Sequence, residues 1–177
     1  MVGLLWAAAA ILGAAGLSKL VRPASTVHAL MVARIPGSAI IASPPAVRAA
    51  GAAELGVAGY VLVCGGSAAA ALLAGCYLIL TAVAGRMLRV SPGQDCGCFG
   101  GSSEPITRWH LLVDIAGLAV GIAATVWPRP SVVDEVTAQG AQGVLLVGLS
   151  LVLAWLGYLL MTALPALGTL RAKVANR

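Results

Sequence analysis

Apolar residues form long runs along this chain, and each run is close to the length of a membrane-spanning helix. The first eighteen residues carry no charge, and between Arg48 and Arg86 the only acidic or basic side chain is Glu54. A helix needs about 20 apolar residues to cross a bilayer, and the break at residues 65–67 divides the second interval into two helices. The pattern predicts five transmembrane helices, at about residues 2–21, 45–64, 68–88, 109–127 and 144–164.

A shorter helix is predicted between the first two of these segments. Pro23 and Pro36 bound this stretch, and its apolar residues recur at helical spacing, although Arg34 falls within the apolar stripe. We expect a helix over about residues 24–35 that lies at the membrane interface and does not cross it.

Composition supports the same class. The chain has 177 residues, of which 60% are hydrophobic and 10% are charged, a balance that excludes a water-soluble globule and indicates a polytopic membrane protein. We expect one all-α transmembrane domain over residues 1–177, with the lipid bilayer as a partner and no nucleic acid. The first run is expected to be retained, because its basic residues follow it, unlike those of a signal peptide.

The basic residues predict an orientation. Ten of the eleven flank one face of the predicted bundle, and Arg129 lies on the other. The ten are Lys19, Arg22, Arg34, Arg48, Arg86, Arg89, Arg108, Arg171, Lys173 and Arg177. Because the basic face of a membrane protein is usually cytoplasmic, we expect the N-terminus outside and the loop at about residues 90–108 on the cytoplasmic side.

That loop holds the candidate chemistry, since Cys96 and Cys98 flank Gly97 and are followed by Phe99 and Gly100. Two cysteines at this spacing lie near the upper limit of disulfide geometry, so a disulfide between them would be strained and prone to exchange. The same thiolates could instead bind Cu(I), Zn(II) or Hg(II), or both cysteines could be inert. Cys64 and Cys76 are expected to stay apart from this pair, with Cys76 acting as a small apolar side chain.

Buried charges are predicted in a layer beneath the loop. Glu54 and Asp114 each lie six residues beyond a basic residue at the same face, which places both at a depth of about 9 Å. Lys19 and His110 belong to the same layer. Because ionisable groups within a membrane are usually paired or functional, two interpretations stay open: the carboxylates serve the cysteines, or an ion pair with Lys19 fixes the helix register.

A thiol–disulfide oxidoreductase mechanism follows from these parts. Thiolate is the reactive form of cysteine, and a nearby cation such as Lys19 or Arg108 favours it. Glu54 or Asp114 could then accept or donate the accompanying proton. The candidate catalytic residues are Cys96, Cys98, Glu54 and Asp114, and the candidate supporting residues are Lys19, Gly97, Phe99, Gly100, Arg108 and His110.

Several of these residues carry a family resemblance. The sequence Gly-Leu-Ser-Lys-Leu at 16–20, Glu54 in the second transmembrane helix, and Cys-Gly-Cys-Phe-Gly at 96–100 before a helix led by Trp109 resemble the MauE branch of the DoxX-like membrane proteins, over residues 3 to about 125. The family pattern leads us to expect Arg-Asn where this chain has Val-Asp at 113–114, and this departure leaves a shared role for Asp114 open.

The resemblance implies a redox-associated protein of the bacterial inner membrane. It implies a role in maturing the disulfide-rich small subunit of methylamine dehydrogenase, with a thioredoxin-like protein or a disulfide-bearing client as partner. The chain is also broadly similar to the bundle of vitamin K epoxide reductase, which uses a second cysteine pair and a quinone. No second pair is suitably spaced here, so the sequence does not support a quinone and we assign no cofactor. A non-catalytic assembly subunit is the remaining alternative.

Overall fold

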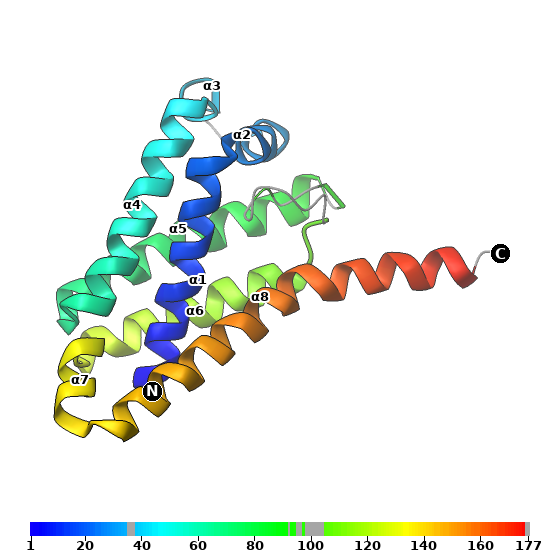
Figure 1. Cartoon of the computed structure of the whole chain (residues 1–177). Coiled ribbons are helices and arrows are strands. Elements are labelled where there is room, and N and C mark those ends of the chain that lie inside the picture. The colour runs from blue at the N-terminus through cyan, green and yellow to red at the C-terminus, as the bar shows by residue number, and fades with distance from the viewer. Residues whose placement is uncertain (35–37, 92, 95–96, 98–104, 176–177) are drawn as a thin grey trace.

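The computed structural model is all-helical (Figure 1). It describes residues 1–34, 38–91, 93–94, 97 and 105–175, without the side chains of 38–39 and 164–175. The helices are α1 (Val2–Val21), α2 (Pro23–Val32), α3 (Ser38–Ile41), α4 (Pro44–Val63), α5 (Gly66–Val90), α6 (Arg108–Val126), α7 (Val132–Gln139) and α8 (Ala141–Ala175).

Five helices of the described chain are long and apolar enough to cross a membrane: α1, α4, α5, α6 and the Ala141–Ala163 part of α8. The predicted fold class, a five-helix membrane bundle with a short helix after the first, is therefore confirmed. The ends of the first four helices differ from the expected ranges by no more than about two residues, which is within the usual disagreement at helix termini.

The structure differs from expectation at the end of α2, in the segment before the last helix and at the end of that helix. Helix α2 ends at Val32, since Arg34 has a positive φ of 48° that stops the helix. Helix α7 was not predicted; the Ser131 hydroxyl caps it by accepting from Asp134 N–H at 3.0 Å. Helix α8 continues well past the expected end near residue 164.

Two pairs of helices approach closely through glycines. At the α1–α4 crossing, a Cβ on Gly16 would lie 2.6 Å from the Gly51 carbonyl oxygen. At the α5–α6 crossing, a Cβ on Gly117 would lie 2.5 Å from the Tyr77 ring, and one on Gly121 would lie 3.0 Å from Ala74. Both contacts are of the small-residue type that lets helices pack closely in membranes.

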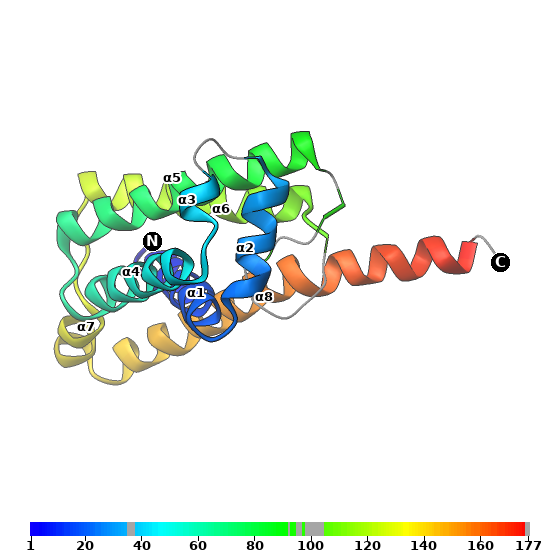
Figure 2. The same cartoon turned by 90° about the horizontal axis from the view of Figure 1, so that it is seen from above.

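The α4–α5 hairpin opens like a V. The two helices meet at Gly65, whose φ is +62°, and Gly66 N–H donates to the Arg129 carbonyl oxygen at 3.0 Å. From this hairpin α4 and α5 diverge (Figure 1). At the open end, α2 runs from the end of α1 toward α5 (Figure 2). We call this open end the loop rim, since the 91–107 segment joins α5 to α6 there.

Two buried apolar clusters hold the bundle. The larger is shared by α1, α4, α5 and α6 and contains Leu5, Ala8, Ala9, Leu12, Val61, Ala69, Ala70, Leu73, Tyr77 and Ala124. The smaller lies at the loop rim and contains Ala29, Ala33, Ala84, Met87 and Ile106. The smaller cluster therefore packs α2 against the end of α5 and the segment that leads into α6.

Candidate functional site

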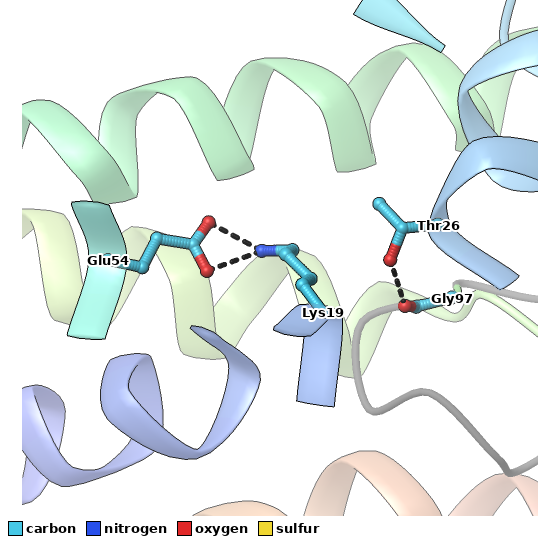
Figure 3. Close-up of polar contacts among 4 residues, drawn as sticks. All are labelled: Lys19, Thr26, Glu54 and Gly97. Atoms are coloured by element: carbon cyan, nitrogen blue, oxygen red, sulfur yellow. Dashed lines mark hydrogen bonds and ion pairs between the residues drawn. The ribbon is translucent and has the colours of Figure 1, made fainter. Parts of the chain in front are cut away.

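A buried ion pair joins α1 to α4 near the loop rim. Lys19 Nζ donates to both carboxylate oxygens of Glu54, at 2.5 Å and 2.6 Å (Figure 3). The two residues are only 5% and 9% exposed. An unpaired charge at this depth would be costly, so each residue stabilises the other in its buried position.

The glycine crossing sets this pair in place. Gly16 and Gly51 each precede a member of the pair by three residues, which places them one turn away on the same helix face. A Cβ on Gly51 would lie 2.7 Å from the Gly16 carbonyl oxygen and 2.9 Å from Lys19 Cβ. Larger side chains would push α1 and α4 apart, so the close crossing is what brings the two charges together.

Other helices contribute to the same buried polar cluster. Asp114 on α6 is 6% exposed, and both Lys19 and Glu54 exert Coulomb interactions on it. The charges of Lys19 and Glu54 also act on the Cys76 thiol of α5. The charges of Asp114 and Glu54 act on the hydroxyl of Tyr77, the next residue. We call Lys19, Glu54, Asp114, Cys76 and Tyr77 the polar cluster.

The polar cluster contains a hydrogen-bonded ion pair, Lys19 with Glu54, and a second carboxyl group, that of Asp114, which lacks such a bond among the described residues. The hydrogen bonds described for Lys19 and Glu54 join them to each other, and no hydrogen bond between described residues reaches Asp114. Tyr77 Oη donates to the Ala8 carbonyl oxygen at 2.8 Å, which ties α5 to α1. The sequence did not indicate that Cys76 belongs here, because its position depends on the rotation of α5 within the bundle.

His110 and Arg108 stand at the start of α6. The Nδ1 atom of His110 lies 3.3 Å from Thr107 N, which donates to it, and 3.1 Å from Thr107 Oγ1. His110 is buried, and its described hydrogen bonds cap α6 and do not join the polar cluster. Arg108 is exposed.

The glycine between the two cysteines is buried against α2. Gly97 has a φ of +67°, and its carbonyl oxygen accepts from Thr26 Oγ1 at 2.7 Å (Figure 3). A Cβ at this position would lie 2.6 Å from the Ser25 carbonyl oxygen. Both the positive φ and the close contact require glycine. Cys96, Cys98, Phe99 and Gly100 lie outside the described residues.

The loop is also held at its base. Ile106 N–H donates to the Gln94 carbonyl oxygen at 2.8 Å, which brings the two ends of the loop together.

Helix α2 is held at both of its ends. At its C-terminal end, Arg86 Nε of α5 donates to the Ala33 carbonyl oxygen at 2.9 Å. Helix α2 is thus fixed to α5 at one end and to Gly97 at the other.

A metal site was an alternative for the cysteine loop. Within the ranges that the structure describes, no group of three or more His, Cys, Asp or Glu side chains gathers as metal ligands would. The two cysteines on which that alternative depends are not among these residues.

Comparison with known proteins identifies the family. The family described as methylamine utilisation protein MauE matches residues 1–128, which include α1 to α6, the Lys19–Glu54 pair and the whole Cys-Gly-Cys loop. No curated protein and no solved structure matches the chain. The match covers more than half of the chain and confirms the resemblance seen in the sequence: this multi-pass membrane protein belongs to the MauE family, which is linked to methylamine utilisation.

Proposed function

We propose that Cys96 and Cys98 cycle between dithiol and disulfide by exchange with a thioredoxin-like protein or a disulfide-bearing client. The observation that carries the proposal is the fixation of Gly97, the residue between them. Gly97 accepts the Thr26 hydrogen bond and packs against Ser25 at the loop rim, so the residue that joins the two cysteines in the chain has a fixed place.

The exchange is a balanced two-electron reaction. One cysteine thiolate attacks the partner's disulfide and forms a mixed disulfide, releasing one partner thiolate. The second cysteine then attacks its neighbour's sulfur, which forms the Cys96–Cys98 disulfide and releases the second partner thiolate. The pair is oxidised, the partner is reduced to a dithiol, and the same steps in reverse oxidise the partner. Strain in so short a disulfide ring favours transfer to the partner.

Helix α2 supports this chemistry at the loop. Thr26, which bonds to Gly97, and Ser25, which packs against it, lie in the first turn of α2. The N-terminal end of a helix carries a partial positive charge that stabilises nearby anions, including thiolates. Because Ser25 and Thr26 contact Gly97, we assign both residues a positioning role for the cysteine pair.

The carboxylates take different roles in this proposal. Glu54 gives both of its oxygens to Lys19, so proton transfer to Glu54 would break the pair; we assign Lys19 and Glu54 to holding α1 and α4 in register. Asp114 is buried beside them without such a bond among the described contacts, so we assign it to proton transfer. An Asp114→Asn variant should slow exchange and change its pH profile, and an unchanged profile would remove Asp114 from the mechanism.

The setting of the reaction is part of the proposal. Family membership and the loop's paired cysteines support maturation of a disulfide-rich subunit of the methylamine dehydrogenase type in the bacterial inner membrane. The charge bias of the sequence supports a cytoplasmic loop rim and an external N-terminus.

Thiol trapping tests the exchange. Cys96→Ser and Cys98→Ser variants should each accumulate a mixed disulfide with a partner, because the remaining thiol cannot resolve it. Cys64→Ser is the matched control: Cys64 is exposed at the α4–α5 hairpin, at the end opposite to the loop rim. If neither cysteine variant forms an adduct above the Cys64→Ser level, thiol exchange is rejected. Stoichiometric Cu(I) binding that both cysteine substitutions abolish would favour the metal alternative.

Sided labelling tests the orientation with the same cysteines. A membrane-impermeant maleimide should label Cys64 from outside the cell and label Cys96 or Cys98 only after the inner face is opened. Labelling in the reverse order would place the loop rim outside.

A further inference from the structure

The open end of the α4–α5 hairpin encloses a cavity of about 350 Å³. Its walls come from α1, α2, α3, α4 and α5, and its lining includes Lys19, Glu54, Thr26, Ala50, Ile79 and Val83. The ion pair supplies the charged groups of a lining that is otherwise mainly apolar. Small-molecule sites combine an apolar lining with a few polar groups in this way, typically over about 300–1,000 Å³.

The cavity is open where exposed residues of α4 and α5 line it. Among its lining residues, Ala50 on α4 is exposed, and Ile79 on α5 is 65% exposed. These exposed positions lie on helices that cross the membrane, so the surface that they reach is the one that lipid covers. A molecule dissolved in the bilayer could therefore enter without passing through water.

The polar groups define the head of the molecule that fits. A lysine ammonium has three N–H donors, and the described bonds of Lys19 use two of them on Glu54. One donor remains for an acceptor oxygen. The Lys19–Glu54 pair has no net charge, and Asp114 beside it adds no positive charge, so an anionic head has no net attraction to this site. The remaining donor calls for a neutral head with a carbonyl oxygen.

We infer that this cavity binds a neutral, single-tailed membrane lipid whose head presents a carbonyl oxygen to Lys19. The enclosed volume holds the head and the start of the tail, and the rest of the tail leaves through the opening between α4 and α5. The inference goes beyond the proposed thiol exchange and does not depend on it. Thr26 lines the cavity and also bonds to the Gly97 carbonyl oxygen of the cysteine loop.

Binding of decyl-benzoquinone, a neutral carbonyl probe with one tail, tests the inference. The protein would be the full chain in nanodiscs, with Cys64→Ser, Cys76→Ala, Cys96→Ser and Cys98→Ser introduced so that no thiol reacts with the probe. We expect saturable binding of one equivalent. Ala50→Phe, at the cavity opening, should weaken binding by about tenfold or more, and Ala49→Phe, the exposed neighbour outside the lining, should leave it unchanged.

A second variant shows whether the loss of binding in Ala50→Phe comes from the blocked opening or from misfolding of that variant. Ile79→Trp places a larger side chain at the same opening from α5, at a position that is mostly exposed, and should weaken binding similarly. Absence of saturable binding, or equal loss in Ala49→Phe and Ala50→Phe, would overturn the inference. Oleate or dioleoylglycerol competing as strongly as the probe would also overturn it, because the first has an anionic head and the second has two tails.

Discussion

The α1–α4 and α5–α6 helix pairs both pack closely through glycines, but they bury different side chains. Both bring backbones together through glycines, Gly16 with Gly51 in the first pair and Gly117 with Tyr77 in the second. One turn beyond its crossing, the first pair buries the Lys19–Glu54 ion pair. At its own crossing, the second pair buries an aromatic ring whose hydroxyl bonds to α1.

The difference shows that close glycine packing and a buried ion pair are separate features of a helix pair. Close packing of small residues suffices to join two helices in a membrane, and α5–α6 achieves it with uncharged contacts. The buried charges of α1–α4 are therefore not needed for helix association as such. In our proposal they fix the register of α1 and α4 beneath the loop rim, and they also line the cavity.

The largest expected effect comes from removing one charge of the ion pair. Glu54→Leu leaves the Lys19 ammonium buried without its partner, which should lower the free energy of unfolding by about 3–5 kcal/mol. Unfolding of the protein in bicelles would measure the loss. The double variant Lys19→Met with Glu54→Leu should recover most of it, because a buried pair replaced by apolar residues costs little. If the double variant is as unstable as Glu54→Leu, the cost does not come from the orphaned charge.

Widening the α1–α4 crossing should have a smaller effect. Gly16→Ala sets a methyl group 2.6 Å from the Gly51 carbonyl oxygen, and relieving this contact should cost about 1–3 kcal/mol. Gly59→Ala on α4 is the matched control, since a Cβ there meets nothing within 4 Å. The same unfolding assay would compare them, and equal stability of the two variants would mean that the crossing is not tightly packed.

The corresponding change in the second pair should be the mildest. Tyr77→Phe keeps the ring against Gly117 and removes only the bond to the Ala8 carbonyl oxygen, a loss of about 0.5–1.5 kcal/mol. Thermal unfolding in detergent would detect it. Thiol exchange, measured as mixed-disulfide formation, should be unchanged. A large loss of exchange with normal stability would show that the Tyr77 hydroxyl itself serves the site, in addition to Asp114.

Much of the fold was predictable from the sequence, because uncharged runs of about 20 residues have few alternatives to membrane-spanning helices. The layer shared by Lys19 and Glu54 was also predictable, since helix rise converts residue number into depth. The proximity of Cys76 and the cavity were not, because they depend on helix rotation and on the divergence of α4 from α5. The continuation of α8 through Pro165 was likewise unexpected, since proline usually marks a helix boundary.

The central claim is that Cys96 and Cys98 act as one redox couple held in place by Gly97. Its most direct test is a redox titration of the membrane-embedded protein, with a thiol mass tag counting free cysteines in a background that lacks Cys64 and Cys76. We expect two tags to be lost together at one midpoint potential. Gly97→Ala should shift that midpoint, while Gly93→Ala, where φ is also positive but the space around it is open, should shift it less. Tags lost one at a time, or retained across the whole range, would contradict the account.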